Sequence, residues 1–162
     1  MISIKTITID IWEDDDLYEK FNDEVLSKEL ADYILRQYKK SRVEEKVTLD
    51  LNIHYKINEK DQVRIRKLIV DYYERKIIES KNEAHYSNQI IAIIMAAAVI
   101  FITLSYMVIP IGILYDIILI AGWVMGWEAI YQLFFSNMSF RMLRRRYKHL
   151  AEGVININEK LQ

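Results

Sequence analysis

The chain has 162 residues, and its 22 Lys and Arg nearly balance 23 Asp and Glu, which excludes a global attraction to nucleic acid. It has no Cys, which excludes disulfide frameworks, thiolate metal sites and thiol nucleophiles. Apolar residues make up 52% of the chain and charged residues 28%, but the two classes are separated along it. Residues 1–86 carry 16 basic and 19 acidic side chains, whereas residues 84–115 carry none. This separation predicts a charged domain joined to a membrane segment.

The first 86 residues predict a small strand–helix–strand–helix domain. Apolar residues alternate at Ile7, Ile9 and Ile11 and again over 47–57, a pattern typical of strands with one buried face. Between them, apolar residues spaced by four over 26–38 predict a helix. A strand–helix–strand connection favours a parallel pair of strands. Two strands are few for a stable sheet, so we expect a third from 154–157 or from another protomer.

The second helix of this domain is predicted to begin at Asn58, because Asp61 follows three residues later in the manner of a capping box. Nothing in the sequence stops this helix before Pro110. We therefore expect it to continue without a break into the first apolar segment.

Two apolar runs, 90–110 and 113–135, predict a transmembrane helical hairpin. They would extend about 31 Å and about 34 Å as helices, against a hydrocarbon core of about 30 Å. Pro110, Ile111 and Gly112 separate the runs and favour a turn. The alternative is a core hairpin of a soluble protein, but the continuous apolarity lacks the polar stripe of such a helix. The fold class is therefore α+β, with a cytoplasmic domain over 1–86, a hairpin over 87–137 and a basic juxtamembrane tail over 138–162.

Basic residues flank the hairpin on both sides and are absent from its turn, so the positive-inside rule places both termini in the cytoplasm. Those after the hairpin are also predicted to contact anionic lipid. The residues before it are Arg75, Lys76 and Lys81, and those after it are Arg141, Arg144, Arg145, Arg146 and Lys148.

Two small-xxx-small pairs, Gly122 with Gly126 and Ala92 with Ala96, predict close packing of helices. They could join the two spans of one chain or two protomers, and the sequence favours neither.

Trp123, Trp127 and Tyr131 recur every four residues. We favour an aromatic belt at the cytoplasmic interface over a functional aromatic platform, because Trp and Tyr concentrate at membrane boundaries.

The intramembrane polar residues predicted by the sequence are Asp116, Glu128 and Gln132. Asp116 lies near the turn and is interpreted as a shallow, hydrated acid that could bond Tyr106. Glu128 has two interpretations. If the span runs to residue 135, Glu128 is embedded and needs water, a proton or a neighbouring subunit. If the span ends near Trp127, Glu128 lies among headgroups.

No catalytic, metal or cofactor site is predicted. The acidic run Glu13 to Asp16 with Glu19 lacks the spacing of a calcium loop and is interpreted as a solvated turn leading into a helix. His54, His85 and His149 have no metal-ligand spacing.

The last third of the chain resembles a group of small bacterial two-span membrane proteins. The residues that carry the resemblance are Gly122-Trp123-Val124, Trp127-Glu128, Phe134-Phe135, Arg144-Arg145-Arg146-Tyr147 and Leu150. These proteins share a soluble N-terminal domain, a Trp-rich second span and an Arg-rich tail. The chain departs from them at Ala129, where they often have Pro, and at Ser136, near which they often have an acid. The resemblance implies a location and a topology but no activity.

The sequence thus predicts a non-enzymatic, multi-pass protein of the bacterial inner membrane. We expect its cytoplasmic domain to self-associate or to dock a protein partner, and we expect no nucleic-acid partner. The alternative is an oligomeric channel or transport component in which Glu128 lines a polar path.

Overall fold

The computed structural model describes residues 4–20, 22–42, 45–108 and 112–160. The chain divides into two compact units, which we call the head (residues 1–78 and 142–162) and the hairpin (residues 79–141). The fold is mixed α+β, as predicted, with a small sheet and two long apolar helices. Of the tail predicted over 138–162, residues 142–162 belong to the same unit as residues 1–78.

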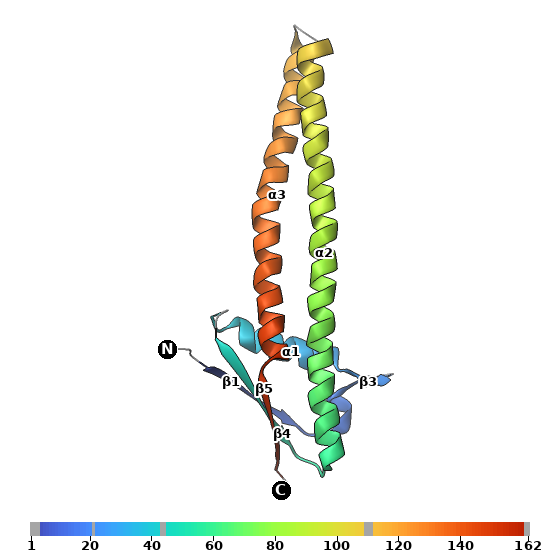
Figure 1. The fold of residues 1–162 in the computed structure, drawn as a ribbon, viewed down its shortest axis with the longest axis vertical. Helices are drawn as coiled ribbons and strands as arrows, with labels where there is room; N and C mark the ends of the chain where they lie inside the picture. The colour runs from blue at the N-terminus through green and yellow to red at the C-terminus, as the bar shows by residue number, and fades with distance from the viewer. Residues whose placement is uncertain (1–3, 21, 43–44, 109–111, 161–162) are drawn as a thin grey trace. The chain divides into compact units, whose positions relative to one another are not determined.

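The head is built on a parallel sheet of β1 (Ile4–Ile11), β4 (Lys46–Ile53) and β5 (Val154–Glu159), with β4 in the centre. Figure 1 shows the three strands side by side. In the register, Ile9 lies beside Leu51, and Leu51 beside Ile157. The two predicted strands and their parallel pairing are confirmed. The third strand comes from the same chain, after the hairpin.

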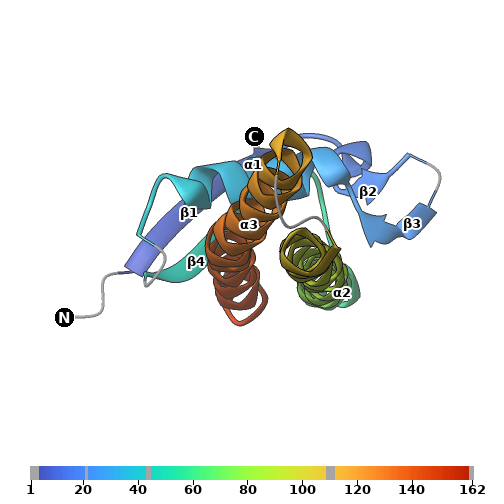
Figure 2. The same cartoon turned by 90° about the horizontal axis from the view of Figure 1, so that it is seen from above.

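The segment between β1 and the first long helix of the head differs from the prediction. The acidic run forms a 3-10 turn, η1 (Asp14–Asp16), which leads into a small hairpin of β2 (Tyr18–Glu19) and β3 (Asn22–Leu26). Only then does α1 (Lys28–Lys39) begin. Figure 2 shows β2 and β3 together at the right of the view. The expectation of a turn leading directly into a helix is wrong. The cause is that Leu17 and Leu26 are both buried, and the chain must fold back between them to bring both into the core.

Two long helices follow, α2 (Glu59–Val108) and α3 (Ile113–Ala151). The predicted capping box is present at the start of α2. The Asp61 amide donates to the Asn58 side chain at 2.9 Å, and the Asn58 amide donates to the Asp61 side chain at 3.4 Å. As predicted, α2 continues unbroken beyond residue 90. Of the predicted turn, Pro110 and Ile111 lie outside the described residues, while Gly112 has a φ of 125°, which favours glycine.

The core of the head lies on one face of the sheet. Alternate residues of β1 and β4 point to this face, and side chains of α1, of the first turns of α2 and of the last turns of α3 cover it. Tyr73 of α2 lies within this core, where its hydroxyl donates to the Ala31 carbonyl at 3.0 Å. The buried residues of this core include Ile7, Ile9, Ile11, Ile34, Tyr38, Leu49, Leu51, Ile65, Ile69, Tyr73 and Leu150.

Burial of Tyr73 predicts a loss of stability at alkaline pH. Burial raises the pKa of Tyr73 well above its ordinary value, whereas in the unfolded chain tyrosine ionises at about pH 10. The unfolded state therefore loses its proton first, and the free energy of unfolding of the head falls as pH rises above about 10. Tyr73→Phe should lower stability at neutral pH by about 1 kcal/mol, through the lost hydrogen bond, and should flatten the alkaline decline. Denaturant unfolding of both chains from neutral to alkaline pH measures the stability at neutral pH and its decline above about pH 10. An equal alkaline decline in Tyr73→Phe would show that Tyr73 does not cause it.

Candidate functional site

The two helices of the hairpin pack through small residues spaced seven apart. This spacing is that of a coiled-coil seam, and the seam residues of each helix face the other helix. Ser87 and Ser136 lie opposite each other, with 3.0 Å between their hydroxyl oxygens. The sequence reasoning missed this seam, although the seven-residue interval was its signal. The seam residues are Ala84, Ile91, Ala98 and Ser105 on α2, all buried, and the buried Gly122 and Ala129 with the half-buried Ser136 on α3.

Gly122 marks the closest approach of the two helices. A Cβ atom placed there would lie 2.7 Å from Cγ1 of Ile102 and 3.2 Å from the carbonyl oxygen of Ala98. At Gly126 the nearest atom to such a Cβ is Cβ of Ala98, at an ordinary 3.8 Å. Both glycines therefore face α2 of the same chain, but only Gly122 requires the missing side chain.

Ala92 and Ala96 are exposed and lie on a different side of α2 from the seam. Ala92 follows the buried Ile91, and Ala96 follows Met95. Successive residues of a helix are rotated by about 100°, so both alanines are directed away from α3. This pair does not contribute to packing within the chain. It remains available to another molecule.

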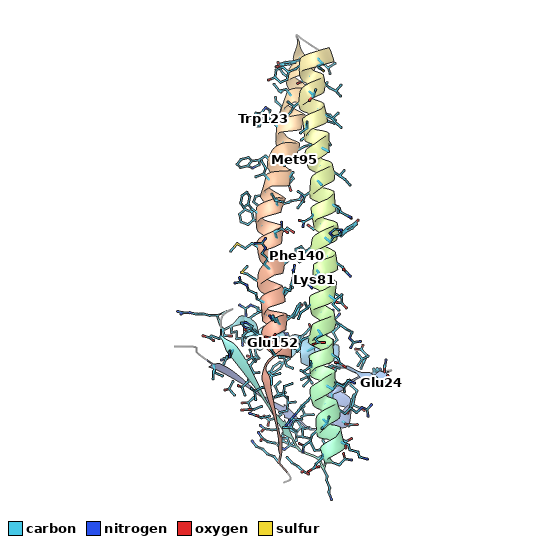
Figure 3. The ribbon with its side chains drawn as sticks, in the orientation of Figure 1. Glu24, Lys81, Met95, Trp123, Phe140 and Glu152 are labelled. Atoms are coloured by element: carbon cyan, nitrogen blue, oxygen red, sulfur yellow. The ribbon has the colours of Figure 1, made fainter. Side chains whose placement is uncertain are left out.

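The three aromatic residues of α3 are also exposed, and Figure 3 shows Trp123 directed away from α2. Trp123 and Tyr131 are separated by about 12 Å along the helix. One headgroup layer is about 5–8 Å thick, and the aromatic belt at the cytoplasmic interface stays a prediction. If Tyr131 marks the boundary, Trp123 belongs to the apolar zone.

The serine pair fixes the height of Glu128 on the hairpin. Eight residues along each helix from Ser87 and Ser136 lead to Met95 on α2 and to Glu128 on α3. The apolar run of α2 begins at Ile90, so Glu128 lies level with apolar residues about 7 Å inside its start. The packing register therefore favours the embedded interpretation of Glu128 over the boundary interpretation.

Glu128 and Gln132 form a polar pair on the outer surface of the hairpin, which we call the α3 pair. The Gln132 amide donates to Oε1 of Glu128 at 2.8 Å, and Glu128 is exposed. Within the part of the chain that the structure describes, Gln132 is the only hydrogen-bond partner of this carboxyl group. If the hairpin crosses a membrane as predicted, this carboxyl group needs a further partner or a proton, because a lone carboxylate is unfavourable in hydrocarbon.

Asp116 lies in the first turn of α3 and is exposed. The ring of Tyr106, which we expected near Asp116, packs edge-on against the ring of the neighbouring Tyr115, with centroids 5.9 Å apart. Asp116 is therefore an exposed acid near the turn of the hairpin. About 18 Å of helix separates it from Glu128.

The basic residues after the hairpin divide into two groups. Arg141, Arg145 and Lys148 are exposed, and Lys148 lies 3.6 Å from Glu152. Arg144 and Arg146 are half-buried, and Arg146 is used inside the head. Lipid contact stays a prediction for all five, and the exposed residues are the ones with side chains directed to the surroundings.

Arg146 holds the C-terminal end of α1. Its Nη1 donates to the carbonyl of Tyr38 at 2.7 Å and its Nη2 to the carbonyl of Ser41 at 3.1 Å. Carbonyls at a helix C-terminus lack partners within the helix and carry partial negative charge. The guanidinium donates hydrogen bonds to these carbonyls and balances their charge. The guanidinium also lies over the Tyr38 ring, 5.2 Å from its centroid.

His149 completes this contact on the other side of Tyr38. The Tyr38 hydroxyl donates to the Glu45 carbonyl at 2.8 Å, so it can only accept from Nδ1 of His149 at 2.9 Å. Nδ1 therefore carries a hydrogen in either charge state of the ring. Burial raises the pKa of Tyr38, although the nearby Arg146 opposes the shift. Residues far apart in the sequence form this network, and no sequence pattern could have shown it.

The second face of the sheet is polar and is not covered by the helices of the core. We call it the polar face, and its residues stand in rows across the three parallel strands. Parallel sheets are usually covered on both faces, so an uncovered face is a candidate contact surface. The polar face consists of Thr6, Thr8, Asp10, Thr48, Asp50, the buried Asn52, Asn156 and Asn158, with His54 directly after β4.

Hydrogen bonds order the side chains of the polar face. Asn52 donates to Asp10 at 2.9 Å, and Asn156 donates to Asp50 at 2.8 Å. Nε2 of His54 also lies 3.3 Å from the Asp10 carboxylate, and the His54 ring stacks on Trp12 with centroids 3.8 Å apart. The bonds from Asn52 and His54 lower the pKa of Asp10. The face thus presents fixed amide and carboxylate groups rather than mobile charges.

Among the described residues, no group of three or more His, Cys, Asp or Glu is arranged to hold a metal ion. Comparison with protein-family models, with curated proteins and with solved structures finds no match for this chain. The candidate site is therefore defined by geometry alone: the α3 pair on the hairpin and the polar face of the head.

The seam predicts unequal effects of two similar substitutions. Gly122→Ala places a methyl group against Ile102 and the α2 backbone, and should destabilise the hairpin by about 1–3 kcal/mol. Gly126→Ala meets only an ordinary contact and should be nearly neutral. Thermal unfolding of the full chain in detergent compares the two variants, and equal stabilities would contradict the proposed close approach.

Arg146 should contribute more to the stability of the head than its neighbour Arg145. Arg146→Gln removes two charge-assisted hydrogen bonds to the end of α1 and should cost about 2 kcal/mol. Arg145→Gln removes an exposed charge and should change stability by less than about 0.5 kcal/mol. Hydrogen exchange of the amides of α1, followed by mass spectrometry, reports the difference. Equally fast exchange of the α1 amides in both variants would show that the lost positive charge, and not the lost hydrogen bonds to α1, destabilises the helix.

Proposed function

We propose that the chain is a non-enzymatic assembly protein of the bacterial inner membrane. Its hairpin crosses the membrane twice, both termini lie in the cytoplasm, and its head self-associates or docks a protein partner.

The pairing of β5 with β4 carries the proposal. β4 precedes the hairpin in the sequence and β5 follows it, yet the two strands are paired along six residues in one sheet. Both ends of the hairpin must then lie on the same side of any membrane that it crosses. This supports an even number of crossings, and two apolar helices supply two.

The surface of the hairpin supports insertion into lipid. Both helices are long and apolar enough to cross a membrane, and only 17% and 11% of their most apolar windows are buried. The core helix of a soluble protein would be mostly buried. Large apolar side chains that face outward include Ile93, Val99, Leu104, Ile117, Ile120, Val124 and Phe134.

The distribution of charge supports a cytoplasmic head. Exposed Arg141 and Arg145 lie at the end of the apolar zone of α3, where they suit anionic headgroups at about 1 kcal/mol per charge. By the positive-inside rule this end remains in the cytoplasm.

A channel or transport component is the second candidate function, and the α3 pair is the observation that favours it. A carboxyl group on the outer surface of the hairpin would line a polar path only if several copies surrounded one. Ion flux in vesicles that is lost in Glu128→Gln would support this function over a purely architectural one.

The topology is testable because the chain contains no Cys. Single cysteines at Lys5 and Lys160, near the two ends, should resist a membrane-impermeant maleimide in intact cells and react after lysis. A cysteine at Gly112, in the turn, should react in intact cells. Labelling of the two ends from opposite sides would overturn the proposal, as would recovery of the chain in the soluble fraction.

Docking by the head is tested on the polar face. Thr8→Arg with Asn158→Arg places two long cations on exposed positions of this face and should abolish lysine-specific crosslinks made by the head in membranes. Val63→Arg with Ile78→Arg adds the same two cations at exposed positions of α2, keeps every lysine, and is the matched control that should leave the crosslinks unchanged. Equal crosslinking in both variants would exclude the polar face as the docking surface.

A further inference from the structure

One side of α2 carries a stripe of polar and small residues within its apolar surface. His85, Gln89, Ala92, Ala96 and Val99 follow one another at intervals of three and four, so they share one side of the helix, and all are exposed. The Gln89 amide lies 3.3 Å from Nε2 of His85. We call these five residues the α2 stripe.

The α2 stripe and the α3 pair lie at the same height on the hairpin. The register set by Ser87 and Ser136 places Glu128 level with Met95, between Ala92 and Ala96, and places Gln132 level with Ile91. Ala92 and Glu128 face away from the middle of the seam, because Ala92 follows the buried Ile91 and Glu128 precedes the buried Ala129. The half-buried Gln132 lies at the edge of the seam. One chain therefore presents a polar surface and a small-residue surface at equal depth in two outward directions.

Lipid cannot satisfy the α3 pair, because hydrocarbon offers no hydrogen-bonding groups. A helix with alanines at the contact can approach closely, so that its backbone carbonyls can accept from the second amide hydrogen of Gln132. The side-chain amide of Gln89 adds a group that can donate to the Glu128 carboxylate. A second copy of this chain has such a surface at the required depth, because all copies share one orientation in the membrane. A different membrane protein would have to match the depth by coincidence.

We propose that the α3 pair of one copy docks on the α2 stripe of the next copy, and this rests on the proposed insertion of the hairpin into a membrane. The two contact surfaces are different, so the interface is heterologous. Such a contact, repeated, generates a closed ring or an open chain of hairpins. The proposal identifies the partner that the Glu128 carboxyl requires.

Disulfide crosslinking tests this interface directly. Val99 on the α2 stripe and Val124, one turn from Glu128, are both exposed and are level with each other. Membranes from cells that express a Val99→Cys chain together with a Val124→Cys chain, oxidised with copper phenanthroline, should give a disulfide-linked dimer containing one chain of each kind. Phe101→Cys, which points to another side of α2, replaces Val99→Cys as the control and should give no mixed dimer.

The other crosslinking outcomes overturn the proposal. A dimer of two Val124→Cys chains would indicate a two-fold contact, and the absence of any disulfide between copies would indicate a different partner or none. Maleimide labelling of the same membranes reports insertion separately. A chain that is correctly inserted but not crosslinked therefore refutes the interface and not the proposed function.

Variants of Glu128 connect the interface to its chemistry. In the crosslinking pair, Glu128→Leu removes the hydrogen-bonding group and should lower the yield of mixed dimer by about threefold or more. Glu128→Gln keeps an acceptor and a donor at the same position and should leave the yield within about twofold. Equal yields in all three chains would show that the α3 pair does not form the contact.

Discussion

The structure depends on the pairing of β5 with β4. This pairing joins the segment after the hairpin to the segment before it, so the head is complete only when both segments are present. Without β5, β4 would become an edge strand with unpaired backbone groups, and a sheet of two strands is marginal. The same contact relates the ends of α2 and α3 and limits any membrane topology to one with both ends on one side.

Each of the two units is held together by its own kind of packing. The head uses aliphatic side chains on one sheet face, with Tyr38, Tyr73 and Arg146 satisfying backbone carbonyls at its margin. The hairpin uses glycine, alanine and serine in its seam and directs its large apolar side chains outward. This inversion suits a lipid environment, because apolar side chains gain nothing there by facing each other and close backbone contact becomes the main attraction. The arrangement of side chains in the hairpin thus agrees with the function proposed from its length and composition.

The packing of the hairpin distinguishes two pairs of polar side chains within its apolar zone. In the seam, the half-buried Ser87 and Ser136 contact each other, whereas the exposed Glu128 bonds only to the half-buried Gln132 among the described residues. A protein that held these groups for its own folding would have turned them toward the seam. Their outward direction, level with exposed alanines of α2, makes assembly of copies the simplest way to satisfy them.

The sequence by itself determined the local features whose signals lie within a few residues. Alternation of apolar residues identified β1 and β4, Asn58 and Asp61 identified the start of α2, and uncharged runs identified two helices able to span a membrane. It missed the β2–β3 hairpin, because that element follows from the need to bury both Leu17 and Leu26 and not from any local pattern. It also left open whether a third strand, and the packing of Gly122, belonged to one chain or to two.

Only the tertiary structure decided those questions, because they concern contacts between residues far apart in the sequence. The register of Ser87 with Ser136 fixed the height of Glu128, the closeness of Gly122 to Ala98 assigned that glycine to the seam, and Arg146 proved to hold the end of α1. Each depends on which helix faces turn toward each other. Composition and periodicity describe a helix face, but they do not state what lies opposite it.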